Sequence, residues 1–149
     1  MSTKVSTWAE VVGIVVLIIS LIFVGIEIRQ NTKVAAAQAV LDLNLGFNEQ
    51  SLILAENAEL NQLLLDGGAD PSQLSTEQYG TYMAFITVTF NIQESAATFY
   101  RNGVVDEEEY ASFLAATCRL VSSPGGAKFW ESSKDFYNPY FRATIENQC

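Results

Sequence analysis

Three side chains in the C-terminal half have the types and spacing to form a polar site inside a helical protein. Glu94 lies in an apolar stretch beside Asn91 and Gln93, Arg101 follows seven residues later, and Arg119 lies in the next predicted helix. One interpretation is a buried or half-buried ion pair that stabilises helix packing. The other is a polar site inside the bundle for a small ligand.

The sequence lacks the side chains on which most catalytic centres rely. It has no histidine and only two cysteines. A histidine-dependent triad, a Cys–His pair and a tetrahedral zinc site are therefore excluded. The pairs Gly67-Gly68 and Gly125-Gly126 lack the strand, turn and lysine of a phosphate-binding loop. We expect a protein that is not an enzyme and that holds no cofactor and no metal.

A second polar pattern lies in the most apolar part of the chain. Gly13, Ser20 and Glu27 recur every seven residues, which places them on one face of a helix that Gln30 and Val34 extend. Such a face on a membrane helix is typical of helix–helix contact, in a homo-oligomer or with a subunit of a larger membrane complex. The alternatives are a cation-conducting pore with Glu27 as a charged ring at its mouth, and a chance spacing.

These residues belong to a stretch that predicts a membrane-spanning helix. Trp8 to Ile28 is almost wholly apolar, and as a helix it is roughly 31 Å long, close to the ~30 Å hydrocarbon core of a bilayer. The nearest Ala-x-Ala, at residues 35–37, lies beyond the charged segment 27–33. This order favours a retained single-pass anchor over a cleaved signal peptide.

A few residues bear on the side of the membrane that the soluble part occupies. Lys4 and the amino terminus precede the span, Arg29 and Lys33 follow it, and this distribution favours a cytoplasmic domain.

The two cysteines give a second indication of the compartment. We expect a buried thiol at Cys118 and an exposed one at Cys149, an arrangement that fits a reducing compartment. A single bridge between the two cysteines is the alternative.

The remainder of the chain predicts helices. No proline occurs before Pro71, so the span is expected to continue as one rod. Residues 83–92 have strand-like composition, but length and caps favour a helix. Helix starts are predicted at Asn57, Ser75, Asp106, Ser123-Pro124 and Asn138-Pro139, and stops at 66–68 and Gly103. The predicted fold class is all-α, with a transmembrane helix and tail over 1–33 and an acidic bundle of about five helices over 34–149.

The net charge restricts the partners of the soluble part. The chain carries −9 at pH 7, and its densest acidic run, 106–109, fits the solvated first turn of a helix. A domain of this charge is repelled by phosphate backbones, so nucleic acid is not an expected partner. Membrane lipid is expected from the span.

Several segments resemble a widespread family of small bacterial membrane proteins. The runs 8–13 and 20–33, with Ile-Arg-Gln-Asn-Thr at 28–32, look like the start of that family, and segments 99–103 and 129–131 are similar to later parts of it. The family has no assigned activity. The resemblance therefore implies a bacterial inner-membrane protein and transfers no functional residue.

Together these features predict a membrane-anchored scaffold or accessory subunit that mediates protein assembly. The alternatives are a homo-oligomeric cation pore lined by Gly13, Ser20 and Glu27, and a membrane-tethered sensor that binds a small ligand near Glu94.

Overall fold

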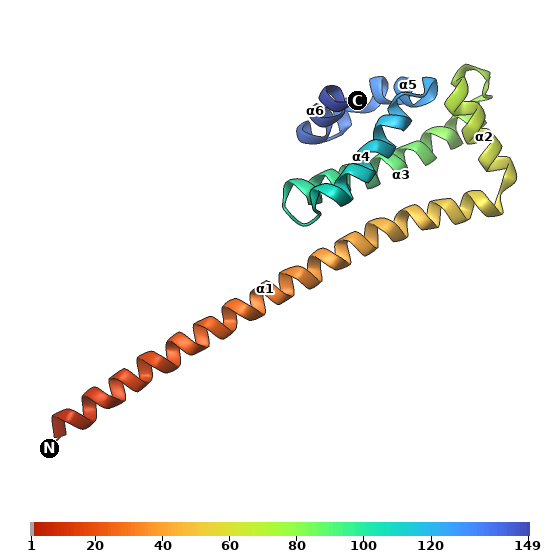
Figure 1. Ribbon diagram of the computed structural model, residues 1–149. Helices are drawn as coiled ribbons and strands as arrows, with labels where there is room; N and C mark the ends of the chain where they lie inside the picture. The colour runs from red at the N-terminus through yellow and green to blue at the C-terminus, as the bar shows by residue number, and fades with distance from the viewer. Residues whose placement is uncertain (1) are drawn as a thin grey trace. The chain divides into compact units, whose positions relative to one another are not determined.

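The computed structural model describes residues 2–149, with side chains from Trp8 onward, and it is helical throughout. The elements are α1 (Ser2–Glu56), α2 (Ala58–Ala69), η1 (Pro71–Gln73), α3 (Thr76–Arg101), α4 (Glu107–Val121), α5 (Pro124–Ser133), η2 (Lys134–Phe136) and α6 (Pro139–Gln148) (Figure 1). The predicted all-α class is confirmed. The strand alternative for residues 83–92 is wrong, because these residues lie within α3.

The chain divides into two units, Met1–Gln38 and Ala39–Cys149. Helix α1 belongs to both, and in the first unit it is a candidate membrane span by length and composition. Its most apolar 18-residue stretch has a mean hydropathy of 3.0 and no buried residue. Every side chain from Trp8 to Ala35 is exposed. The first unit therefore presents an apolar surface that the described chain leaves uncovered.

Local cap signals begin the helices of the second unit. The Ser75 hydroxyl accepts a hydrogen bond from the Gln78 backbone, and the Gln78 side chain accepts one from the Ser75 backbone, which completes the predicted capping box. Asn57, Asp106, Ser123 and Asn138 each accept a backbone hydrogen bond in the same way. Gly103, with a φ of +69°, follows α3 in the left-handed conformation that glycine favours. These starts and this stop agree with the sequence.

The core of the second unit surrounds Phe90, which is fully buried on α3. Its ring stacks on Phe129 at 4.9 Å and on Trp130 at 5.6 Å, and Tyr137 lies 5.9 Å away, all between centroids. Aromatic pairs at these distances add about 0.5–1.5 kcal/mol to the stabilisation from area burial. Phe141 packs on Trp130 and Tyr137, so rings connect α5, α6 and the residue that follows η2 to Phe90 of α3.

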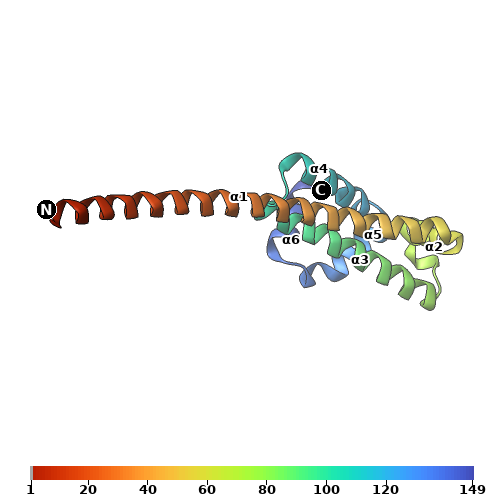
Figure 2. The same cartoon turned by 90° about the horizontal axis from the view of Figure 1, so that it is seen from below.

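Residues 39–56 of α1, the distal segment of α1, lie beside α3 in both views (Figures 1 and 2), and their side chains contact α3 and α4. Leu43 is buried, and the Phe47 ring lies 5.5 Å from that of Phe113 on α4. Gln50 Nε2 donates a hydrogen bond of 3.3 Å to Thr89 Oγ1 on α3. The distal segment is therefore part of the bundle.

Two glycines allow α2 and α5 to approach each other closely. A Cβ on Gly125 would overlap the carbonyl oxygen of Gly67 and the hydroxyl of Tyr82. The prediction that residues 66–68 end a helix is wrong, because α2 continues to Ala69. Gly67 is instead buried against the Tyr82 ring. A glycine that is needed for packing therefore looks, in the sequence, like one that ends a helix.

A disulfide joins Cys118 on α4 to Cys149, with Cα atoms 4.9 Å apart. The expectation of two free thiols is wrong, because α6 returns to α4 and carries Cys149 back to it. The bridge spans 31 residues of sequence, and such a cross-link stabilises a fold by about 3–4 kcal/mol, mainly by restricting the unfolded chain.

The close approach of α2 and α5 makes Gly125→Ala destabilising. The added methyl group meets the backbone of Gly67, and overpacking of this kind costs about 1–3 kcal/mol. Gly80→Ala is the matched control, because nothing lies within 4 Å of its Cβ position and alanine gains about 1 kcal/mol of helix propensity. Thermal unfolding in detergent, followed by circular dichroism, compares the two. Equal stability of Gly125→Ala and the parent protein contradicts this packing.

Candidate functional site

Glu94 on α3 binds the start of α6. Its Oε1 atom accepts hydrogen bonds from the backbone N–H of Asn138 at 2.6 Å and from Asn138 Nδ2 at 2.9 Å. Asn138 Oδ1 in turn accepts from the Phe141 N–H at 2.9 Å, so the same residue caps α6. A carboxylate is favoured at a helix N-terminus, where the helix dipole is positive. Glu94 thus fixes α6 against α3.

The two predicted arginines lie apart from Glu94. The Arg101 guanidinium lies over the Tyr140 ring of α6, 5.3 Å from its centroid, as a cation–π contact. Arg119 is exposed on α4. The structure therefore does not bring Glu94, Arg101 and Arg119 into one polar site, and the partner of Glu94 is Asn138.

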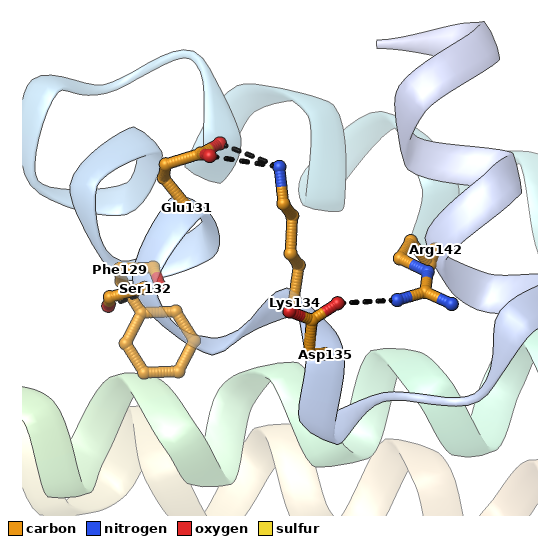
Figure 3. Close-up of polar contacts among 6 residues, drawn as sticks. All are labelled: Phe129, Glu131, Ser132, Lys134, Asp135 and Arg142. Carbon is orange, nitrogen blue, oxygen red and sulfur yellow. Dashed lines mark hydrogen bonds and ion pairs between the residues drawn. The ribbon is translucent and has the colours of Figure 1, made fainter.

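The basic side chains next to this region have acidic partners on the surface (Figure 3). Lys134 Nζ lies 2.9 Å from a carboxylate oxygen of Glu131, and Arg142 donates to Asp135 at 2.6 Å. Both acids are largely exposed, so solvent screens each pair and it adds little to stability. These pairs leave the Glu94 carboxylate without a compensating basic side chain from η2 or α6.

A surface pocket of about 260 Å³ lies beside Glu94. It combines polar side chains of α3 with aromatic side chains of α5 and η2. Its lining is Thr87, Asn91, Glu94, Phe129, Ser133, Phe136 and Tyr137. Phe136 is 89% exposed at this pocket, which is unusual for so large an apolar side chain. A carboxylate beside aromatic rings is an environment that favours a small organic cation.

The pKa of Tyr137 responds to its burial in this pocket and to the charge of Glu94. Burial raises the pKa of its hydroxyl to about 12, and the negative charge of Glu94 adds to the increase. Burial also raises the pKa values of Tyr82 and Tyr110. Within residues 2–149 no three acidic or cysteine side chains are placed to hold a metal ion. The hydrogen bonds that Glu94 makes in this region are those to Asn138, which caps α6.

The other predicted site is the face of Gly13, Ser20 and Glu27 in the first unit. All three residues are exposed. The Ser20 hydroxyl donates to the Val16 carbonyl at 2.8 Å, so its donor is satisfied within the helix. Nothing lies within 4 Å of a Cβ built on Gly13. The face is therefore open, and a neighbouring backbone can approach it closely at Gly13.

Comparison with family models, with curated proteins and with solved structures gives no match for this chain. Any functional proposal for this chain therefore rests on the sequence and structural features described above.

Replacement of Glu94 by glutamine lowers the pKa of Tyr137 below about 12 but leaves it above the ordinary 10.0, because burial is the larger cause. The folded pKa exceeds the unfolded one, so the stabilisation from the neutral phenol is complete below pH 10 and is lost as the pH rises towards 12. Ultraviolet titration of the phenolates measures the shift, and Tyr137→Phe identifies the transition. An unchanged Tyr137 pKa in Glu94→Gln contradicts the contact.

Proposed function

We propose that the chain is a membrane-anchored helical scaffold or accessory subunit that assembles with itself or with a larger membrane complex. The observation that carries this proposal is the uncovered apolar surface of α1 from Trp8 to Ala35. Burying a single leucine-sized side chain is worth about 1.5–3 kcal/mol, so this surface strongly favours lipid or a partner helix over water. The resemblance noted in the sequence supports the inner membrane of a bacterium as the location.

The face of Gly13, Ser20 and Glu27 is the part of the span best suited to a partner helix. Lipid chains are as apolar as leucine, so membrane helices associate through close packing and polar contacts, for which small residues are favoured. Gly13 offers an open backbone and Glu27 an ionisable group at one end of the apolar run. An ionisable residue there is costly in lipid unless it is hydrated or paired.

The disulfide is evidence on which side of the membrane the soluble domain lies. Disulfides persist in oxidising compartments and are rare in the cytosol. The charges that favoured a cytoplasmic domain are few, Lys4 before the span and Arg29 and Lys33 after it. The Cys118–Cys149 bridge is the stronger of the two signals, so we place the soluble domain on the oxidising side.

Gly13→Leu weakens the assembly in lipid by at least about tenfold, because the new side chain blocks the close approach of a helix. Gly25→Leu is the matched control: Gly25 is equally open, but it lies about 120° around the helix from Gly13. The dimer fraction in proteoliposomes at several protein-to-lipid ratios measures the effect. Equal loss in both variants, or loss in neither, contradicts this face as the seam.

The proposed side of the membrane predicts that a C-terminal alkaline phosphatase fusion, which is active only outside the cytoplasm, is active. In sealed cells, a membrane-impermeant maleimide modifies Cys118 and Cys149 only after reduction, because the bridge blocks both thiols beforehand. Cys118→Ser serves as the control and exposes Cys149 without reduction. An inactive fusion and thiols protected from the reagent even after reduction place the domain in the cytoplasm.

A further inference from the structure

The distal segment of α1 has two apolar faces, and the bundle covers one of them. Leu43 is 6% exposed, and Phe47 and Gln50 on the same side contact α4 and α3. Leu41, Leu45 and Leu52 are 50%, 53% and 62% exposed. At 3.6 residues per turn, these three leucines lie within about 20° of the direction opposite to Leu43. The second face is therefore turned away from the bundle.

The spacing on this exposed face is that of a coiled coil. Leu41, Leu45, Asn48, Leu52 and Ala55 are separated alternately by four and three residues. This is the repeat of the two core positions of a heptad, with Leu45 and Leu52 at a positions and Leu41, Asn48 and Ala55 at d positions. Counted back from Leu41 in sevens, the sequence reads Val34, Glu27, Ser20 and Gly13. The residues of the membrane face and those of the leucine face are therefore spaced by the same seven-residue repeat.

The charges beside the leucine face suit a parallel partner of the same sequence. Glu49 and Glu56 follow core positions on one flank, and Asn44 and Ser51 precede core positions on the other. In a parallel pair these flanks oppose each other, so each acid meets a neutral polar residue of the other copy. An antiparallel pair would set acid against acid. Two copies in one membrane share an orientation and are parallel.

We propose that a second copy of this chain covers the face of Leu41, Leu45 and Leu52, as a parallel coiled coil that follows the membrane span. Three half-exposed leucines per copy present on the order of 300 Å², so a pair buries roughly 600 Å², less than the ~1,000 Å² that a free-standing interface needs. Confinement in the membrane raises the effective concentration of the second copy. The inference thus rests on the proposed self-assembly through the span.

The test is cysteine cross-linking of the full chain in native membranes. In the parent protein Cys118 and Cys149 are already paired, so a thiol at Leu45→Cys is the reactive one. A mild oxidant is expected to link position 45 of one copy to position 45 of another, and peptide mass spectrometry identifies the link. Ile53→Cys is the control: it is 45% exposed but lies off the seam, so its cross-link forms at least about tenfold less.

The other outcomes separate this inference from the proposed function. If the full chain is oligomeric in the membrane but Leu45→Cys links no better than Ile53→Cys, the leucine face is not the interface, although assembly through the span stands. If no homo-oligomer forms, the coiled coil fails; if no other protein accompanies the chain either, the proposed function fails as well. If the thiol at position 45 links to a different protein, that protein occupies the face and the second copy is excluded.

A charged residue on the seam gives an independent check. Leu41→Lys is expected to reduce the cross-link at position 45 at least about tenfold, because a lysine would be buried against its counterpart in the parallel pair. Leu41 is half exposed, so the substitution leaves the bundle folded, and an intact Cys118–Cys149 bridge verifies this. An undiminished cross-link in this variant overturns the coiled coil.

Discussion

The apolar surface of α1 is the constraint on which the rest of the structure depends. The most apolar 18-residue stretch of this helix has a mean hydropathy of 3.0 and no buried residue. The second unit covers one side of the distal segment, through Leu43 and Phe47, and the side chains from Trp8 to Ala35 stay exposed. Removal of such surface from water is the dominant favourable term in folding and association, so lipid and a partner helix are the natural complements.

The second unit is held together by contacts between residues that lie far apart in the sequence. Phe90 on α3 contacts rings of α5 and the ring of Tyr137, which follows η2. Glu94 binds the start of α6, and the disulfide links the end of the chain, after α6, to α4. These contacts are structural in kind. The distal segment is attached to this core by Leu43, by the Phe47–Phe113 ring contact and by the hydrogen bond between Gln50 and Thr89. A scaffold needs such attachment if its outer face is to meet a partner reproducibly.

Local signals made much of the fold predictable. The capping box of Ser75 and Gln78 and the caps at Ser123 and Asn138 depend on residues within three positions of each other, and the sequence shows such pairs directly. The contacts that sequence reasoning missed join distant residues. Glu94 and Asn138 are 44 positions apart, and each carried a recognisable local signal without any sign that the two meet.

The same limit explains the errors over the glycines and the cysteines. Gly67 lies in a helix-stop signal, and its role in packing depends on its contact with the Tyr82 ring of α3. Cys118 and Cys149 lie far apart in sequence, and their pairing depends on the return of α6 to α4. For the candidate site, the importance of Glu94 was predictable from its apolar setting, whereas its partner and the neighbouring aromatic pocket depend on tertiary packing.

The most direct measurement is the protein mass of the particle that contains the full chain, extracted with its native lipid and measured without detergent exchange. One copy has a mass of 16.4 kDa. Self-assembly predicts a protein mass of at least two copies, and incorporation in a complex predicts a mass that exceeds one copy by the mass of a partner. A protein mass of one copy, at every ratio of protein to lipid, contradicts the proposed function.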